Sequence, residues 1–343
     1  MQLGKRIRVL VVDDSIVFRE VLLRGISADP GIEVVAMAAD PYDARDKIIK
    51  FKPDVMTCDV EMPKMNGIEF IKRLIPQYPL PVIVVSAVSS AVFDAMNAGA
   101  IDFVTKPDVR SAKNVEIFIN EMIMKVKIAS TARVFLRKTG DSPRQITANT
   151  NTGANKIIAI GASTGGTEAI HSVLKHLSGG IPGILIVQHI PPDFSRMFAE
   201  RLNATTAMVV KEAQTGDYIT QGHVLIAPGD QHMKIKRVGY RYRVECFESE
   251  KVNGHCPSVD VLFESVAEEA ENQAIGIILT GMGCDGAKGL LSMRRKGART
   301  IGQDEGSSVV YGMPKVAFNI GAVEKQASLE GIPRQIYSLL GEG

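Results

Sequence analysis

Short apolar runs rich in valine and isoleucine alternate with amphipathic stretches of helical spacing through about residue 125. The runs at residues 8–12, 33–39, 55–58, 81–85 and 102–105 are predicted strands, and the stretches at residues 15–28, 42–51, 68–74, 90–98 and 115–125 are predicted helices. Strands that alternate with helices in this way favour the α/β class. The pattern therefore predicts a doubly wound parallel sheet with helices on both of its faces.

Polar side chains stand at the carboxyl ends of these predicted strands, where ligands bind in doubly wound sheets. They are Asp13, Asp14, Asp59, Ser86 and Lys106. Because converging carboxylates repel one another, a hard cation such as Mg²⁺ is expected among them, with room left for phosphate oxygens. The set predicts phosphoryl transfer to a carboxylate. An alternative, that Asp14 merely caps the next helix, leaves Ser86 and Lys106 unexplained.

A second feature begins at residue 156, where the sequence reads Lys-Ile-Ile-Ala-Ile-Gly-Ala-Ser-Thr-Gly-Gly. A β-branched run ends at Gly161 and places Ser163 just before a predicted helix, as in the G-x-S-x-G nucleophile elbow. We interpret Ser163 as a nucleophile and expect backbone N–H groups around Thr164 and Gly165 to face a developing oxyanion. A dinucleotide-binding turn would need glycine at residue 163 and an acidic residue after the next strand, and the sequence has neither.

The next predicted strand, residues 183–188, ends on His189, which precedes two prolines. Neighbouring parallel strands lie about 5 Å apart, so side chains just beyond two such strands can come within hydrogen-bonding reach. We therefore predict His189 as the general base. A further strand at residues 274–279 leads through a glycine-rich turn to Asp285, which can orient His189. Two alternatives remain: Asp285 as the N-cap of a helix at residues 288–295, and Cys284 as a different nucleophile.

The other histidines offer no second base by the same reasoning. His171 and His176 lie in the helical stretch after Ser163, where packing at the surface or a helix end is expected. His223, His232 and His255 lie in or just beyond a hairpin-like region at residues 222–254, away from any predicted carboxyl strand end.

Composition narrows the class of protein. A chain of 343 residues that is 45% hydrophobic can form two cores, and its net charge of +2 gives no overall attraction to nucleic acid or anionic lipid. The four cysteines show no C-x-x-C spacing, which favours reduced thiols in a cytoplasm.

The apolar run near the start is too short for a signal peptide, and no segment has the apolar length to span a bilayer. A DNA-binding regulator is disfavoured because the second half lacks a basic recognition helix.

Residues 124–153 differ from both halves, with six Lys/Arg against the single Asp141 and then a polar run. This composition is typical of an interdomain tether. We therefore predict one domain at residues 5–122, a linker at 123–153 and a second domain at 154–341.

Residues 9 to about 122 closely resemble the receiver domain of two-component response regulators, which implies a flavodoxin-like fold with a five-stranded parallel sheet. The resemblance implies that Asp59 accepts the phosphoryl group. It also implies that Asp13, Asp14, Asp59 and the carbonyl of Glu61 bind Mg²⁺. Ser86 and Lys106 would sense the phosphoryl group, and Phe103 holds the position of the switch aromatic.

Segments of the second half, taken with the receiver half, resemble the chemotaxis response-regulator methylesterase family. The segments are residues 161–166, 188–192, 227–229, 257–260 and 280–286. The resemblance implies a Rossmann-like α/β domain with a mostly parallel sheet and a β-hairpin region. Its implied activities are demethylation of glutamate methyl esters on chemoreceptor cytoplasmic domains, with release of methanol, and deamidation of receptor glutamines. Cys284 departs from the asparagine that is frequent in relatives.

The same resemblance implies a chemotaxis histidine kinase as phosphodonor, a cytoplasmic location, no cofactor for the hydrolysis itself, and no nucleic-acid partner or direct membrane insertion. A phosphorylation switch tethered to a permanent triad suggests that the receiver covers the cleft until it is phosphorylated. The alternative function is a receiver-controlled binding module without catalysis, in which residues 161–166 form an anion site at a helix start.

Overall fold

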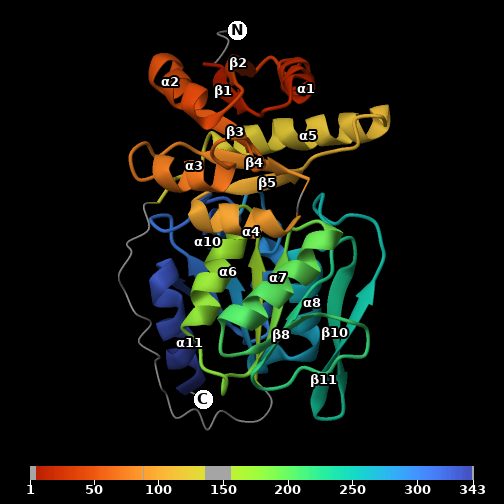
Figure 1. The fold of residues 1–343 in the computed structure, drawn as a ribbon. Helices are drawn as coiled ribbons and strands as arrows, with labels where there is room; N and C mark the ends of the chain where they lie inside the picture. The colour runs from red at the N-terminus through yellow and green to blue at the C-terminus, as the bar shows by residue number, and fades with distance from the viewer. Residues whose placement is uncertain (1–4, 88, 136–155, 342–343) are drawn as a thin grey trace. The chain divides into compact units, whose positions relative to one another are not determined.

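The computed structural model describes residues 5–87, 89–135 and 156–341, and the chain divides into two compact units at Lys138 (Figure 1). Most of the predicted linker, residues 136–153, lies outside the described residues. The last helix of the first unit, α5, spans Ala112–Ala129 and so continues past the boundary predicted at residue 122.

The first unit contains a five-stranded parallel sheet of order β2-β1-β3-β4-β5, which confirms the predicted doubly wound fold. Its strands are β1 Ile7–Val12, β2 Ile32–Ala38, β3 Val55–Asp59, β4 Val82–Ser86 and β5 Asp102–Thr105. Its helices are α1 Ile16–Ile26, α2 Pro41–Phe51, α3 Gly67–Leu74, α4 Ser89–Ala98 and α5. Helices α1 and α5 share one face, where the rings of Phe18 and Phe118 lie 5.5 Å apart. The carboxyl ends of β1, β3 and β4 are level, because Val12 pairs with Cys58 and Asp59 with Val85.

Two helix starts in this unit follow from their caps. Ser15, and not Asp14, is the N-cap of α1, since its side chain accepts a hydrogen bond from the Phe18 N–H. The capping alternative for Asp14 is therefore wrong. Helix α5 begins earlier than predicted because Ser111 caps it, and it ends later because its buried stripe continues beyond residue 125 to Val126 and Ala129.

The second unit contains a seven-stranded sheet of order β14-β13-β12-β6-β7-β9-β8, with a separate two-stranded sheet, β10-β11. The strands of the large sheet are β6 Ile157–Ala162, β7 Gly183–Gln188, β8 Val209–Glu212, β9 His223–Ile226, β12 Ala274–Ile278, β13 Arg299–Gln303 and β14 Lys325–Ala327. Every neighbouring pair of these strands is parallel. The mostly parallel sheet expected for this half is thus confirmed.

Helices and the hairpin complete this unit. They are β10 His232–Val238, β11 Arg241–Phe247, α6 Gly166–Lys175, α7 Pro192–Thr205, α8 Val259–Glu269, α9 Ala287–Arg295, α10 Met313–Asn319 and α11 Ile332–Gly341, with 3₁₀ turns η1 Glu271–Gln273 and η2 Leu329–Gly331. One sequence interpretation is wrong: residues 223–226 are not part of the hairpin region. They form β9, whose apolar residues are buried between β7 and β8 in the main sheet.

The core of the second unit determines where the strand ends lie. Strands β6, β7 and β12 are buried along their whole length, as expected for central strands of a parallel sheet. Helix α8 packs beside the β10–β11 hairpin, as Figure 1 shows, and contributes Leu262 and Phe263 to the core. Its first residue, Val259, lies against Gly161 of β6, where a Cβ would come within 2.2 Å of Val259 Cγ1. The start of α8 is therefore held at the carboxyl edge of the sheet.

None of the helices among the described residues combines the length and the apolar character needed to cross a bilayer.

Candidate active site

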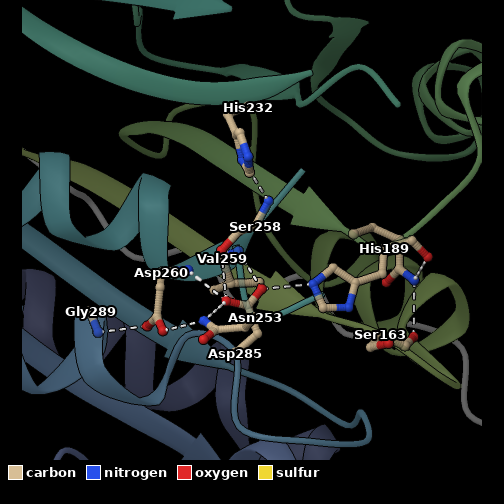
Figure 2. Close-up of polar contacts among 10 residues, drawn as sticks. Ser163, His189, His232, Asn253, Ser258, Val259, Asp260, Asp285 and Gly289 are labelled. Carbon is tan, nitrogen blue, oxygen red and sulfur yellow. Dashed lines mark hydrogen bonds and ion pairs between the residues drawn. The ribbon is translucent and has the colours of Figure 1, made fainter. Parts of the chain in front are cut away.

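Ser163 and His189 follow two residues that are directly paired across neighbouring strands. Ala162 of β6 pairs with Gln188 of β7, and the His189 N–H donates to the Ala162 carbonyl at 3.2 Å. The side-chain amide of Gln188 donates to the carbonyls of both Ser163, at 3.0 Å, and His189, at 3.1 Å. Register and hydrogen bonds thus bring the predicted nucleophile and base to the same point of the sheet edge (Figure 2).

Asp285 lies on the other side of the His189 ring. His189 Nε2 is 2.8 Å from Asp285 Oδ2, and both side chains are almost completely buried. The second ring nitrogen, Nδ1, has no hydrogen-bond partner among the described residues and lies on the edge of the ring where Figure 2 draws Ser163. The ring can therefore take a proton at Nδ1 while Asp285 holds Nε2.

The Asp285 carboxylate caps helix α8. It accepts hydrogen bonds from the backbone N–H of Val259 at 2.7 Å and of Asp260 at 3.2 Å, and from Ser258 Oγ at 2.7 Å. The alternative that Asp285 caps the helix after it is wrong, because the N-cap of α9 is Gly286. A carboxylate at a helix N-terminus meets the positive end of the helix dipole, which favours its ionised form.

Electrostatics agree with this geometry. Burial alone would raise the pKa of the Asp285 carboxyl, but hydrogen bonds from His189, Asn253 and Ser258 outweigh burial and hold this pKa well below its ordinary value. Asp285 is therefore a fixed anion at neutral pH. It can keep a proton on Nε2 of the imidazole and stabilise the imidazolium form.

A further histidine, His255, contacts the His189 ring face to face. The rings of His189 and His255 are stacked, with centroids 3.7 Å apart and planes inclined by 11°. Burial, together with the neighbouring His189, lowers the pKa of His255 to about 4, so His255 is neutral when the site operates near neutral pH. His189 thus packs against a second, uncharged ring.

Sequence reasoning missed His255 because it looked only at carboxyl strand ends. His255 belongs to a tight turn in which Val252 and His255 exchange backbone hydrogen bonds of 3.0 Å. The two central residues, Asn253 and Gly254, have φ values of 53° and 82°. An Asn-Gly pair is a strong signal for such a two-residue hairpin, so the turn was recognisable, although its position over the sheet edge was not.

The elbow itself depends on close approach of backbone. Ser163 N–H donates to the Thr280 carbonyl at 3.0 Å, which links the ends of β6 and β12. A Cβ at Gly281 would come within 2.7 Å of Ser163 Cβ, so only glycine fits there without displacing the serine. Gly165 is the N-cap of α6 with φ of 75°, a left-handed conformation that glycine adopts without strain. Thr164 is buried beside it. The two predicted oxyanion donors therefore stand where the elbow enters α6.

Cys284 is exposed, whereas its neighbour Asp285 is buried. The two side chains thus face different surroundings.

The predicted site residues of the first unit lie at the carboxyl ends of β1, β3, β4 and β5. Carboxylate oxygens of Asp13, Asp14 and Asp59 all lie within 4.8 Å of one another. Lys106 Nζ lies 2.6 Å from Asp59 Oδ2 and 2.8 Å from Asp13 Oδ2. Ser86 is buried at the end of β4, and its carbonyl accepts from the Lys106 N–H at 3.0 Å.

Charge in this cluster is divided between acids and a base. Burial raises the pKa of Asp13, and the charge of Asp59 adds to that effect. Burial alone would lower the pKa of Lys106, but its hydrogen bonds to Asp13 and Asp59 raise it, so the ammonium stays charged. A set of carboxylate oxygens at this spacing suits a hard divalent cation.

The two remaining predicted residues lie beside this cluster. The Glu61 N–H donates to Asp59 Oδ1 at 3.3 Å. Phe103 is buried within β5, where Lys125 Nζ lies 5.1 Å from the centre of its ring.

Comparison with known proteins gives each unit a family. A model of the CheB methylesterase family matches residues 158–336, and a model of the response regulator receiver domain matches residues 9–116. The protein-glutamate methylesterase/protein-glutamine glutaminase 2 of Syntrophomonas wolfei is 58% identical, covering 98% of this chain and 99% of its own. A protein-glutamate methylesterase/protein-glutamine glutaminase of Syntrophotalea carbinolica is 50% identical over the same shares of the two chains.

A solved structure gives the same result for the second unit. The crystal structure of the Thermotoga maritima CheB methylesterase catalytic domain superposes with a TM-score of 0.53 and 36% identity, covering 55% of this chain and 100% of that one. These matches extend over both units and nearly the whole sequence. The chain therefore belongs to the CheB methylesterase family, with a response regulator receiver domain preceding the methylesterase domain.

Proposed function

We propose that this chain demethylates glutamate methyl esters on methyl-accepting chemoreceptors and deamidates receptor glutamines, and that Ser163, His189 and Asp285 carry out the hydrolysis. The activities are those for which its relatives are named. The observation that supports the residue assignment is the 2.8 Å contact between His189 and Asp285, with Ser163 one residue beyond the strand position paired with Gln188.

The chemistry follows from the geometry of these three side chains. Ser163 Oγ attacks the ester carbonyl and gives its proton to Nδ1 of His189, while Asp285 holds the imidazole through Nε2. The tetrahedral intermediate collapses, the proton passes from His189 to the leaving oxygen, and methanol departs. Water, deprotonated by His189, then attacks the acyl-enzyme and releases glutamate and Ser163. With a glutamine substrate, ammonia leaves in place of methanol.

The oxyanion of each tetrahedral intermediate needs donors that are fixed before the reaction. We assign this role to the backbone N–H groups of Thr164 and Gly165, at the positive end of the α6 dipole. Loss of one such donor typically costs roughly 3 kcal/mol of transition-state stabilisation.

The receiver domain supplies the switch. We assign Asp59 as the phosphoacceptor, with Asp13, Asp14, Asp59 and the Glu61 carbonyl as the groups that would hold Mg²⁺. The cation would neutralise charge on the phosphoryl group. Lys106, which contacts both Asp13 and Asp59, and Ser86 are positioned to follow the added charge, and Phe103 would move with them.

The domain assignment behind this proposal is a receiver at residues 5–122, a linker at 123–153 and a hydrolase at 154–341. We propose a chemotaxis histidine kinase as its phosphodonor and the cytoplasmic domains of chemoreceptors as its substrate, and from these partners we propose a cytoplasmic location. The hydrolase chemistry needs no cofactor in this scheme. A non-catalytic binding module is not favoured, because the relatives are named for two hydrolase activities.

Methanol release from methylated receptor tests the proposal, with wild type, Ser163→Ala and Asp59→Asn each measured with and without a small phosphodonor. We expect no release by Ser163→Ala, and basal release without stimulation by Asp59→Asn. A Ser163→Ala protein that released methanol at the wild-type rate would remove the assignment of the nucleophile.

A further inference from the structure

Two buried carboxylates lie beside each other where helices α8 and α9 begin. Asp285, which precedes α9, accepts from the first N–H groups of α8, as described above. In return, Asp260, in the first turn of α8, accepts at 2.7 Å from the N–H of Gly289, in the first turn of α9. The two helices therefore exchange caps, and both carboxylates are fixed by the same pair of helix starts.

One neutral side chain joins these two acids. Asn253 Nδ2 donates to Asp285 Oδ1 at 2.8 Å and to Asp260 Oδ2 at 2.7 Å, so each hydrogen of its amide serves one carboxylate (Figure 2). Asp285 and Asp260 are 1% and 4% exposed, so water contributes little to screening their mutual repulsion.

The pKa values of the two acids are shifted in opposite directions. Burial raises the pKa of Asp260, and the charge of Asp285 adds to that effect. The pKa of Asp285 is held low by donors that include Asn253. An amide stabilises the anion without carrying a charge, so it leaves the negative charge of Asp285 available to His189. A lysine in the same place would compete with the imidazole for that charge.

We propose that Asn253 is a positioning residue for the hydrolase reaction: it holds Oδ1 of Asp285, so that Oδ2 stays directed at His189 Nε2, and it separates Asp285 from Asp260. This inference rests on the triad of the proposed function. It adds a residue from the tight turn at residues 252–255, the same turn that supplies the ring stacked on His189.

The conformation of Asn253 provides clean test variants. Its φ of 53° lies in the left-handed region, which glycine, asparagine and aspartate tolerate best. Asn253→Gly therefore removes the amide without straining the backbone. Asn253→Asp keeps the size of the side chain but replaces a donor with a carboxyl. Lys52→Gly, at another left-handed position but in the first unit, is the matched control.

The experiment uses the full chain and two readouts: methanol release from methylated receptor, and the rate of inactivation by a small fluorophosphonate that needs only an activated serine. Because a hydrogen bond to a charged group is lost, we expect Asn253→Gly to lower kcat and the inactivation rate about tenfold. We expect KM to stay within about twofold, and Lys52→Gly to behave as wild type.

The dependence of activity on pH distinguishes a positioning role of Asn253 in the reaction from a purely structural role. The ionisable groups that contact the Asn253 amide are Asp260 and Asp285. The charged or titratable groups that act on these two acids or on the stacked ring are Glu264, Lys288, His189, His255 and Lys251, the residue before the turn. In Asn253→Asp, the introduced carboxyl can donate only when it is protonated. We therefore expect its activity relative to wild type to rise as the pH falls from about 8 to about 6.

A double variant tests the link to the second carboxylate. If the amide keeps the two acids apart, Asn253→Gly should cost less in an Asp260→Asn background than in wild type. Unfolding of each variant is followed in parallel. Wild-type kcat and inactivation rate in Asn253→Gly would overturn the inference. So would an Asn253→Asp protein whose loss tracks unfolding and does not vary with pH. If Ser163→Ala still reacted with the fluorophosphonate, the proposed function would be overturned instead. The failure of the inference on Asn253 and the failure of the proposed function can thus be told apart.

Discussion

His189 presents Nε2, not Nδ1, to Asp285, at 2.8 Å from Oδ2. In chymotrypsin-type triads the acid holds Nδ1 and the serine faces Nε2, so the triad that we propose would use the two ring nitrogens in the opposite sense. Asp285 lies in the turn after β12, and β6 separates β12 from β7, so the acid and the histidine come from two strands that flank β6. In this proposal the roles of the three side chains are the same as in those triads, and only the imidazole tautomer differs.

The first prediction concerns the nucleophile. Ser163→Ala should lower methanol release by at least about 10³-fold and abolish labelling by a fluorophosphonate, because Ser163 directly follows the strand position paired with Gln188, next to His189. Ser172→Ala, a serine in the same following helix, is the control and should label normally. Labelling of Ser163→Ala at the wild-type rate would show that a different residue reacts.

The second prediction concerns Asp285 and acid. The pKa of Asp285 is lowered by folding, so its carboxylate stabilises the folded state above the unfolded value near 3.8, and that stability is lost as the pH falls through the folded value. The difference in unfolding free energy between wild type and Asp285→Asn should thus be constant above about pH 5 and shrink in stronger acid. Urea titrations of the second unit measure it. A difference that grew on acidification would contradict this reading.

Activity of the same variant gives the third prediction. Asp285→Asn should lower kcat by about 10³–10⁴-fold, since an amide cannot keep the proton on Nε2 and stabilise the imidazolium. The loss should persist across the neutral range, because Asp285 is ionised throughout it. Methanol release as a function of pH checks this. Recovery of activity at any neutral pH would argue that Asp285 has no part in the reaction.

His255 gives a fourth prediction. Its pKa falls from 6.5 to about 4 on folding, so between these values the unfolded chain binds more protons and stability declines as the pH falls. His255→Phe, which keeps a ring against His189 but cannot titrate, should lose less stability than wild type between about pH 6.5 and pH 4.5. It should also keep more activity than His255→Ala. Equal activity of the two variants would show that the stacked ring does not matter.

A fifth prediction concerns the receiver. Asp59→Asn should keep basal methanol release but lose all stimulation by a phosphodonor, and removal of divalent cations with a chelator should have the same effect on wild type. Lys106→Met should still bind the cation, but a phosphodonor should stimulate it only weakly, because the variant lacks the ammonium that contacts both Asp13 and Asp59. Stimulation of Asp59→Asn to the wild-type level would exclude Asp59 as the acceptor.

The sequence predicted much of the architecture because the strands are buried apolar runs with sharp ends. Strand β7 lies at the predicted residues 183–188, and that end places His189 beside the residue after β6. Strand β9 was misassigned, since a four-residue apolar run next to a hairpin carries no sign of which sheet it joins. Its pairing depends on contacts far away in the sequence.

The surroundings of Asp285 could not be predicted from local pattern. An acidic residue before a helix normally caps that helix, and here the cap belongs to α8 because the two helix starts meet in space. Likewise, the Asn-Gly turn was readable, but its position against His189 follows from the packing of α8 and the β10–β11 hairpin. Such relationships arise only once the chain is folded.

Because the starts of α8 and α9 share their capping carboxylates, the reactivity of the proposed site depends on the order of the first turns of these two helices. If the first turn of α8 frays, Asp285 loses the hydrogen bonds from Val259 and Asp260 and no longer holds His189 in place, although the sheet is still intact. Heating or a mild denaturant should therefore abolish methanol release before the sheet of the second unit unfolds. Loss of activity should then be an early sign of unfolding in this protein.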